Sequence, residues 1–518
     1  MNNLNEDIES LIEANASDFE ISQRFKQAIG SYLDSLPQLF EQTQGKDFLV
    51  RHTKVLDQFI VQMYKTVLRR MFGNYLPMRN AIPIALTALG SYGREQLCVH
   101  SDIDLMIVYA PQEGYNSEAI IEKFLYLAWD AGLKLGHRVH KTTALFTAAD
   151  EDITIRTAMM EARFIIGSNY TWHATQRELE KIRRHKPKDF LLAKLNESDD
   201  RRRVHPISMQ PNIKEGVGGL RDAQLLYWVA KTRFGIDSLN TLRDSLFTDD
   251  SYRRYRIALE LIFRVRSALH LVTGKQHDQL NLEHLPKVRK LLGFKTDMRL
   301  ATQVIEAMWR INNFSTIFVT KMVRPLLCDL THLPNLRAQR IRRGIFISDD
   351  SVFASFHLAS LPIEALLDIL VGLEDKPYCF DDSFVSQFSY TTIAHPLNKR
   401  IKLLLRKLFE REHTYDILKL FYDAGVLVNL IPAMKKALFL PQFDGYHHYP
   451  VGLHSLQCIK AYESIDIPEI KSLYNDLSHR DRTMLKIVVL FHDLGKGRKQ
   501  DHSEVGVKLV RPMMDKMG

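Results

Sequence analysis

Apolar residues recur at three- and four-residue steps through the first eighty residues, as in FLVRHTKVLDQFIVQMYKTVLRRMF (48–72). This period predicts amphipathic helices. The period then changes, because IPIALTAL (82–89) and DIDLMIVYA (102–110) are short apolar runs of the kind found in buried strands, with the turn-forming GSYG between them. A helical pattern and then an alternating segment follow within residues 118–143. The order strand, turn, short helix, strand, helix, strand predicts a small α/β unit.

The rest of the chain is predicted to be mostly helical. From about Asp150 to Leu330 the helical period returns, interrupted by the glycine-rich loop EGVGGLRD (215–222). A mixed to helical section follows, and PQFDGYHHYP (441–450) marks a boundary before further amphipathic helices that carry histidines. The expected sections are an N-terminal helical region, an α/β core, a helical domain, a mixed connecting region and a C-terminal helical domain, at residues 1–80, 81–150, 151–330, 331–440 and 441–518.

Length and composition are those of a globular protein with several domains. A chain of 518 residues exceeds the size of one hydrophobic core, which predicts two to four domains. Its 45% hydrophobic and 25% charged residues argue against disorder. The net charge is +9, but the basic residues are dispersed, so charge alone does not indicate nucleic acid.

The cysteines and the apolar runs indicate the compartment. The four cysteines lie far apart and without CxxC spacing, which argues against a disulfide framework and a zinc ribbon and fits a reducing cytoplasm. No apolar run approaches the roughly 18 to 20 residues that span a bilayer, and the acidic N-terminus does not have the layout of a signal peptide. We therefore expect a cytoplasmic protein with neither nucleic acid nor a membrane among its partners.

Two carboxylates begin the second predicted strand. Asp102 and Asp104 flank one residue of an otherwise apolar run, so both point to one face while Ile103 and Leu105 point into a core. Such a pair repels and loses hydration unless a cation lies between the carboxylates. One Mg²⁺ ion, or a pair about 3.5 to 4 Å apart, relieves this repulsion and suits phosphate chemistry. Asp102 and Asp104 are therefore predicted to be catalytic and to bind Mg²⁺.

Gly90 and Ser91 end the preceding strand about ten residues upstream. A glycine there lets the backbone approach a phosphate, amides at a helix start can cradle it, and Arg94 can add a charge-assisted contact. Gly90, Ser91, Gly93 and Arg94 are therefore predicted to bind the nucleotide. The layout LGSYGRE…SDIDLMIV resembles the nucleotidyltransferase superfamily, whose pattern is an apolar residue, Gly-Gly or Gly-Ser, and a later DxD. The resemblance implies an α/β domain of the polymerase-β-like kind.

The reaction implied is in-line attack of a hydroxyl on the α-phosphorus of a nucleoside triphosphate, with release of pyrophosphate. One metal ion would lower the pKa of the hydroxyl and another would neutralise the triphosphate. A third carboxylate usually completes such sites from a later strand, but the segment LKLGHRVHK (133–141) contains no acid. Asp152, Glu161 and Asp222 remain as alternatives.

A second cluster lies near the C-terminus. The pair His492–Asp493 follows an apolar run and precedes Gly-Lys-Gly, and His454 lies in HHYPVGLHSL. Imidazole and carboxylate suit Mn, Fe, Zn or Mg at a hydrolytic centre. The pattern resembles the HD phosphohydrolase superfamily, whose ligands run His…His-Asp…Asp, and His454, His492 and Asp493 match its first three positions. The resemblance implies a divalent metal of unspecified identity, with Lys496 against a substrate phosphate. The two segments also contain His447, His448 and His502.

The fourth position of the HD pattern is not matched. Asp515 is expected on the helix next to the His-Asp pair, where it would be a poor substitute. The sequence therefore predicts a partial, all-α HD domain whose hydrolytic activity is impaired.

Three further stretches resemble the bifunctional PII uridylyltransferase/uridylyl-removing enzymes of bacterial nitrogen signalling. They are PNIKEGVGGLRDAQLLYW (211–228), RVRSALHLVTGKQHDQL (264–280) and YHHYPVGLHSL (446–456), and the resemblance runs from roughly residue 40 onward. It implies UTP as donor and a tyrosine on the T-loop of a PII signalling protein as acceptor. The loop from Lys214 to Asp222 is expected either to close over the nucleotide or to pack at a helix start.

The chain departs from that family in two ways. Gly452 stands where the family tends to have Asp, two residues before the first HD histidine. The remaining HD helices and the paired glutamine-sensing ACT domains are not in this sequence. We therefore expect the N-terminal portion of such an enzyme, or a protein without family-style glutamine control.

Two rival functions remain. A tRNA CCA-adding or poly(A)-type nucleotidyltransferase usually shows Gly-Gly-x-x-Arg-Asp before DxD, where this chain has GSYGRE. A catalytically silent regulator that binds nucleotide or PII would fit the missing third acid and the partial HD domain, but the intact Asp102/Asp104 pair argues against it.

Overall fold

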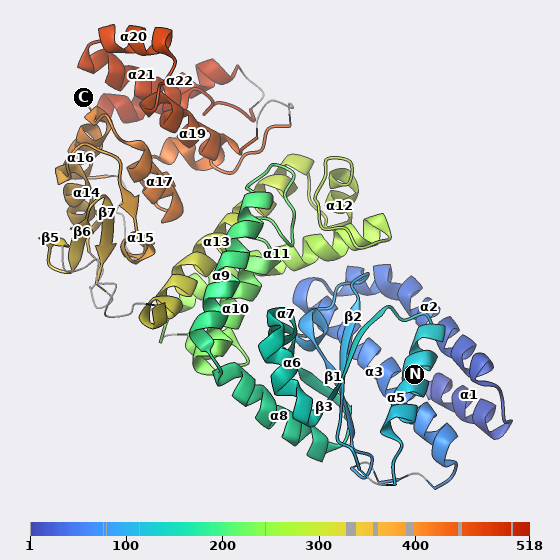
Figure 1. The fold of residues 1–518 in the computed structure, drawn as a ribbon. Coiled ribbons are helices and arrows are strands. Elements are labelled where there is room, and N and C mark those ends of the chain that lie inside the picture. Colours follow the sequence, from blue (N-terminus) through green and yellow to red (C-terminus); the bar gives the residue numbers. More distant parts are fainter. Residues whose placement is uncertain are drawn as a thin grey trace. The chain divides into compact units, whose positions relative to one another are not determined.

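Figure 1 draws the computed structural model as a ribbon, and the chain folds into two compact units. The first consists of Met1–Glu197, Tyr227–Thr241 and Glu260–Gly293, and the second of Ser198–Leu226, Leu242–Leu259 and Phe294–Gly518. The residues described are 2–75, 77–78, 80–112, 114–243, 245–327, 338–355, 361–389, 397–443, 448–498 and 501–517. None of the described helices is both long and apolar enough to cross a membrane.

Three helices open the first unit, as the apolar period predicts: α1 (Asn2–Glu13), α2 (Asp18–Gln42) and α3 (Gly45–Phe72). The start of α2 is a capping box, in which the Ser17 side chain accepts from the Glu20 amide and the Glu20 carboxylate accepts from the Ser17 amide. This exchange satisfies backbone donors that would otherwise lack a partner at the helix start.

The predicted α/β unit forms a four-stranded sheet of order β3-β2-β1-β4. Strand β1 (Ile84–Ala88) pairs antiparallel with β2 (Ile103–Tyr109) and with β4 (Arg163–Gly167). Strand β2 pairs in parallel with β3 (Leu135–Lys141), which places Asp104 opposite Gly136. The GSYG segment, predicted as a turn, is itself a short helix, α4 (Gly90–Gly93).

Helices cover both faces of this sheet. Ile103 and Leu105 belong to the core shared with α2, α3 and α5 (Ser117–Asp130). Met106 and Val108 point to the opposite face, into a smaller core. That face is covered by α6 (Leu145–Glu151), α7 (Ile153–Met159) and α8 (Asn169–Arg184), after the 3₁₀ turn η1 (Thr142–Ala144). By strand alternation Asp102 and Asp104 lie on the face of α6 to α8.

Strand β4 was not predicted, and the expectation of helix throughout from Asp150 is wrong at residues 163–167. The strand contains only three consecutive apolar residues between two helices, which is too short a run for periodicity to identify. Gly167 adopts φ +118°, and a Cβ there would meet the Ile84 carbonyl oxygen at 2.2 Å. The sheet therefore extends beyond residue 150, where the sequence places the end of the α/β unit.

The section to residue 327 is otherwise helical, as predicted. Its helices are α9 (Pro187–Val204), α10 (Leu220–Phe234), α11 (Asp249–Thr273), α12 (Leu285–Leu291) and α13 (Asp297–Leu327), with a 3₁₀ turn η2 (Leu239–Leu242). In the second unit the glycine-rich loop before α10 packs by its backbone, because a Cβ at Gly218 would meet the Met308 carbonyl oxygen at 1.8 Å. The Asp222 carboxylate accepts from the Gly218 amide at 2.7 Å and holds this loop to the start of α10. The glycine at position 218 is therefore explained by close packing of the loop before α10.

A buried ion cluster lies within the stretch 264–280 of the first unit. Arg266 Nε donates to Asp278 Oδ1 at 2.7 Å, and His270 Nε2 lies 3.2 Å from the same oxygen. Burial alone would raise the pKa of Asp278, but the hydrogen bond from His270 and the charge of Arg266 hold this pKa well below its usual range. The carboxylate is therefore ionised in the folded protein.

Replacing Asp278 with Asn is expected to lower the free energy of unfolding by about 3 kcal/mol, because Arg266 and His270 remain buried with no anion between them. Since the pKa of Asp278 is lower in the folded than in the unfolded chain, its stabilisation is present above about pH 4 and is lost as the pH falls further. Chemical denaturation at pH 7 and pH 3 measures both effects. The exposed Asp34→Asn is the control; equal stabilities of the two variants at pH 7 would contradict the prediction.

The second unit contains a small sheet and a helical core. Its sheet, of order β5-β6-β7-β8, consists of β5 (Gln339–Arg342), β6 (Ile345–Ser348), β7 (Ser351–Ala354) and β8 (Cys379–Phe380). The helices that follow are α14 (Ile363–Gly372), α15 (Asp382–Ser389), α16 (Lys399–Glu410), α17 (Tyr415–Asp423), α18 (Leu427–Leu430), the 3₁₀ turn η4 (Pro432–Lys436), α19 (Val451–Glu463), α20 (Pro468–Asp476), α21 (His479–Phe491) and α22 (His502–Met517). One continuous core joins this sheet to α19 and α21 through residues such as Val352, Leu456 and Leu490.

Candidate functional site

The side chain of Asp104, on β2, is flanked in space by Gly90 and Gly136. A Cβ at Gly90 would stand 2.9 Å from Asp104 Oδ2, and a Cβ at Gly136 on the neighbouring strand would stand 2.9 Å from Oδ1. Gly90 also adopts φ +56°, a conformation that other residues rarely take. Each carboxylate oxygen is therefore bordered by a glycine, and a side chain at either position would press against it.

Charge around Asp104 favours a cation. Burial raises the pKa of Asp104 above its ordinary value, and the negative charges of Asp102 and Glu161 raise it further. Asp102 is exposed immediately before β2, whereas Asp104 is half-buried. A bound cation would relieve this repulsion, and the oxygen-only donor set of Asp102 and Asp104 suits a hard ion such as Mg²⁺.

Arg138 is a charged neighbour that the sequence analysis does not single out. It lies on β3 opposite Met106, so its side chain is on the same face as Asp104, and its charge lowers the pKa of Asp104. Strand alternation in LGHRVHK could have indicated it, had the pairing of β3 with β2 been known. An exposed guanidinium there is available to phosphate oxygens.

The short helix α4 contains Gly90, Ser91 and Gly93 of the predicted nucleotide-binding residues, and Arg94 follows it. Ser91 is half-buried, and its carbonyl accepts from the Gln96 amide at 2.8 Å. Gly93 is buried, and a Cβ on it would meet the Glu161 carbonyl oxygen at 2.1 Å and that of Ala88 at 2.9 Å. The close approach of α4 to the backbone at Glu161 therefore requires glycine at position 93.

Replacing Gly93 with Ala is expected to displace α4, because the clashing atoms belong to backbone and cannot rotate away. We expect a loss of stability of about 3 kcal/mol, the upper end for overpacking, and loss of nucleotide binding. Gly30→Ala is the matched control, since nothing lies within 4 Å of a Cβ at Gly30 inside helix α2. Calorimetric titration with a nucleoside triphosphate and thermal unfolding check both effects. Native-like binding by Gly93→Ala would contradict this account.

Glu161 is the third-carboxylate candidate that lies near Asp104. It sits in the turn before β4, its side chain is only 2% exposed, and it forms an ion pair with Arg94. The Trp228 indole N–H donates to the same carboxylate oxygen. Arg94, predicted to contact the nucleotide, is thus held by Glu161 and also donates to Gln96 at 3.3 Å. Glu161 couples Arg94 to the site, and its charge acts on Asp104.

The other two candidates have different roles. Asp152 caps helix α7, where its Oδ1 accepts from the Thr154 amide at 2.7 Å. Asp222 belongs to the second unit, is fully buried, and is paired with Arg201 and Arg202. Of the three alternatives, only Glu161 is among the charges that act on Asp104, and its carboxylate is already held by Arg94 and Trp228.

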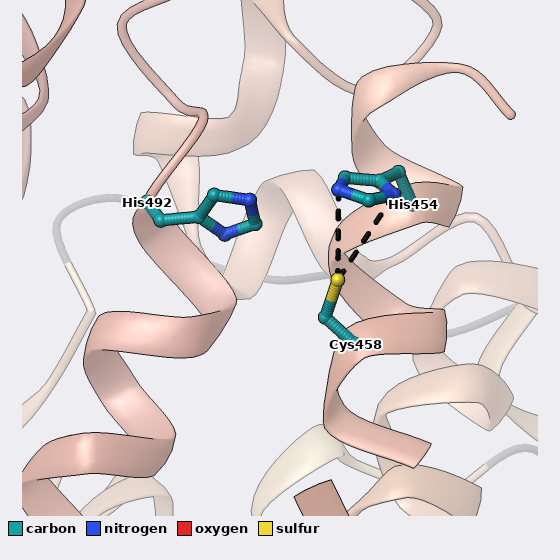
Figure 2. A group of neighbouring side chains, drawn as sticks. All are labelled: His454, Cys458 and His492. Atoms are coloured by element: carbon teal, nitrogen blue, oxygen red, sulfur yellow. Dashed lines mark hydrogen bonds between the residues drawn. The ribbon is translucent and has the colours of Figure 1, made fainter. Parts of the chain in front are cut away.

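The predicted second site brings its three residues together. His454 lies on α19, while His492 and Asp493 directly follow α21. Nε2 of His454 lies 3.8 Å from Asp493 Oδ2, and Nε2 of His492 lies 3.4 Å from the same atom. Cys458, which belongs to none of the sequence motifs, projects from α19 toward the His454 ring (Figure 2) and lies near His492 as well.

Neighbouring groups orient this second cluster. His492 Nδ1 donates to the Val489 carbonyl at 2.8 Å, since a carbonyl can only accept, so in the neutral ring the lone pair is on Nε2. Lys496 donates to Asp493 at 2.7 Å and to Gln442 at 2.8 Å. Lys496, predicted to contact a substrate phosphate, therefore lies at the edge of the cluster.

Among the described residues, the group of converging ligand side chains includes none of the other residues of the HD prediction. A Cβ at Gly452 would stand 2.6 Å from the Leu438 carbonyl oxygen, so the glycine allows tight packing at the start of α19. His502 begins α22, and Asp515 is exposed near its end. His448 is exposed, and His447 lies outside the described residues.

Two families match the chain. Residues 35–138, which include Gly90, Asp102 and Asp104, match the nucleotidyltransferase family DUF294. Residues 189–319 match the family GlnD PII-uridylyltransferase. Together the matches support a nucleotidyl-transfer function. The chain therefore contains a nucleotidyltransferase domain followed by a PII-uridylyltransferase domain, as the sequence resemblance predicts.

Proposed function

We propose that the chain transfers UMP from UTP to a tyrosine hydroxyl of a PII signalling protein and releases pyrophosphate, in a Mg²⁺-dependent reaction. The observation that carries this proposal is the Asp104 carboxylate, bordered by Gly90 and Gly136 and repelled by Asp102 and Glu161. The match to PII uridylyltransferases over residues 189–319 supports the choice of donor and acceptor.

The residues of the site take distinct roles in this proposal. Asp102 and Asp104 would hold Mg²⁺, which when bound lowers the pKa of the attacking hydroxyl and neutralises charge on the triphosphate. Gly90 and Gly136 leave space beside Asp104 for the reacting phosphate. Arg138 binds phosphate oxygens from the β3 side, and Glu161 fixes the orientation of Arg94.

Incubation of the full chain with UTP, Mg²⁺ and PII, followed by intact mass, tests the proposal. We expect PII to gain the mass of UMP, and only when Mg²⁺ is present. If tRNA were labelled with CTP or ATP while PII stayed unmodified, the chain would be a CCA-adding or poly(A)-type enzyme. Binding of UTP or PII without turnover would identify a silent regulator.

A second candidate function is metal-assisted hydrolysis at the C-terminal cluster. The convergence of His454, His492 and Asp493 favours it, because imidazole and carboxylate ligands can activate a metal-bound water. The sequence predicts that removal of UMP from modified PII is weak. Release as fast as transfer, lost in His492→Ala, would contradict that prediction.

A further inference from the structure

A sulfur atom lies inside the C-terminal cluster. Cys458 follows His454 by one turn of α19, and its Sγ lies 3.5 Å from His454 Nε2 and 4.0 Å from Nδ1. One ligand atom each from His454, Cys458 and His492 can be chosen so that all three lie within 4.8 Å of one another. Figure 2 shows the two side chains on α19 and His492 on the facing segment, with the sulfur directed at the His454 ring.

Two helices with separate anchors set this spacing. On one helix, side chains four residues apart lie on the same face, so His454 and Cys458 point the same way. On the other, the Val489 carbonyl fixes the His492 ring and turns Nε2 toward the cluster. The His454 and His492 ring centres are 5.4 Å apart. The three donors therefore converge on one point from two rigid elements.

We propose that Cys458 is a metal ligand, and that His454, Cys458 and His492 form a zinc-selective site to which Asp493 can add an oxygen. Zn–N bonds of about 2.0 Å and Zn–S bonds of about 2.3 Å at tetrahedral angles place donors about 3.3 to 3.6 Å apart. The sulfur already lies at that distance from His454 Nε2, and all three ligand atoms lie within 4.8 Å of one another, so a shift of His492 by about 1 Å would complete the set. Because thiolate is a soft ligand, the set favours Zn²⁺ over Mg²⁺.

This proposal extends the metal prediction for the C-terminal cluster and does not depend on nucleotidyl transfer. Imidazole and carboxylate alone leave Mn, Fe, Zn and Mg all open. A thiolate among the ligands favours zinc over the other three metals. The metal of this cluster would then differ from the Mg²⁺ proposed for Asp102 and Asp104. The test therefore needs neither UTP nor PII, and its failure leaves the transferase proposal intact.

Cobalt(II) serves as the spectroscopic probe for zinc. The full chain, freed of metal by a chelator, is titrated with Co²⁺ while its absorption is recorded. We expect a sulfur-to-cobalt charge-transfer band in the near ultraviolet, lost in Cys458→Ser and bleached by Zn²⁺ but not by excess Mg²⁺. Cys379→Ser is the matched control, because Cys379 is exposed on β8 and is not in the cluster. A wild-type spectrum without the band, or an unchanged band in Cys458→Ser, would overturn the proposal.

Zinc affinity and thiol reactivity give two further measurements. Competition with a chromophoric chelator should show Zn²⁺ binding weakened by about 100-fold in Cys458→Ser, since loss of mere outer-shell partners costs 10–100-fold. In the wild-type chain, Zn²⁺ should protect Cys458 but not Cys379 from alkylation, measured by peptide mass spectrometry. The alkylation experiment needs no variant and so does not depend on folding of a mutant. Equal alkylation of Cys458 with and without Zn²⁺ would refute the ligand role.

Discussion

Replacing Asp104 with Asn is expected to lower the rate of UMP transfer by about 10³-fold or more, which corresponds to roughly 4 kcal/mol of transition-state stabilisation. An amide keeps the shape of the side chain but removes the charge that would hold Mg²⁺ beside Gly90 and Gly136. The fold should not suffer, because burial and the nearby carboxylates already disfavour the ionised form of Asp104. Its thermal stability should equal or exceed that of the wild type.

The measurement is single-turnover transfer to PII, with thermal unfolding of the same samples. Asp130→Asn is the control, since Asp130 ends helix α5, is exposed, and undergoes the same chemical change. The combination of lost activity and retained stability separates a ligand role from a packing role. Transfer within about tenfold of the wild type would remove Asp104 from the active site.

Glu161→Gln is expected to reduce both stability and transfer. The amide cannot neutralise Arg94, whose side chain is 10% exposed, and an unpaired buried charge costs about 3 to 5 kcal/mol. Release of Arg94 should also misplace α4, because the Glu161 backbone packs against Gly93. We therefore expect a lower midpoint of chemical denaturation and a raised KM for UTP.

Two comparisons make this second prediction specific. Glu122→Gln, on the exposed face of α5, should change neither quantity. Trp228→Phe removes the indole donor to Glu161 but leaves the ion pair with Arg94, so it should cost less than Glu161→Gln. If Glu161→Gln were as stable and as active as the wild type, Glu161 would have no part in the site.

Periodicity predicted the elements that carry long, regular patterns. The strands at Ile84–Ala88 and Ile103–Tyr109 follow from short apolar runs, and the flanking helices follow from apolar positions that recur every three or four residues. Strand β4 was not predicted because its stability comes from pairing with β1, a long-range contact that local sequence does not encode. The position of GSYG was predicted, but its helical geometry depends on packing against the Glu161 backbone.

The sequence predicts those site residues that are close to one another along the chain. Asp102 and Asp104 share a strand face by simple alternation, and His492 with Asp493 are neighbours in sequence. The charges of Glu161 and Arg138 act on Asp104 because of the tertiary fold. Glu161 precedes β4 at one edge of the sheet, and Arg138 lies on β3 at the other. Cys458 could not be predicted for another reason. A single cysteine four residues after a histidine is no signal of a metal site, and only the fold brings His492 near it.

The hydrogen bond from Trp228 to Glu161 has an optical consequence. Trp228 lies in the PII-uridylyltransferase match, Arg94 in the nucleotidyltransferase match, and Glu161 between them. The indole is buried and donates to the carboxylate that also holds Arg94, so we expect its fluorescence to change when that ion pair rearranges. If Arg94 contacts the nucleotide as proposed, binding should change the emission of this ring against that of the other three tryptophans in the chain.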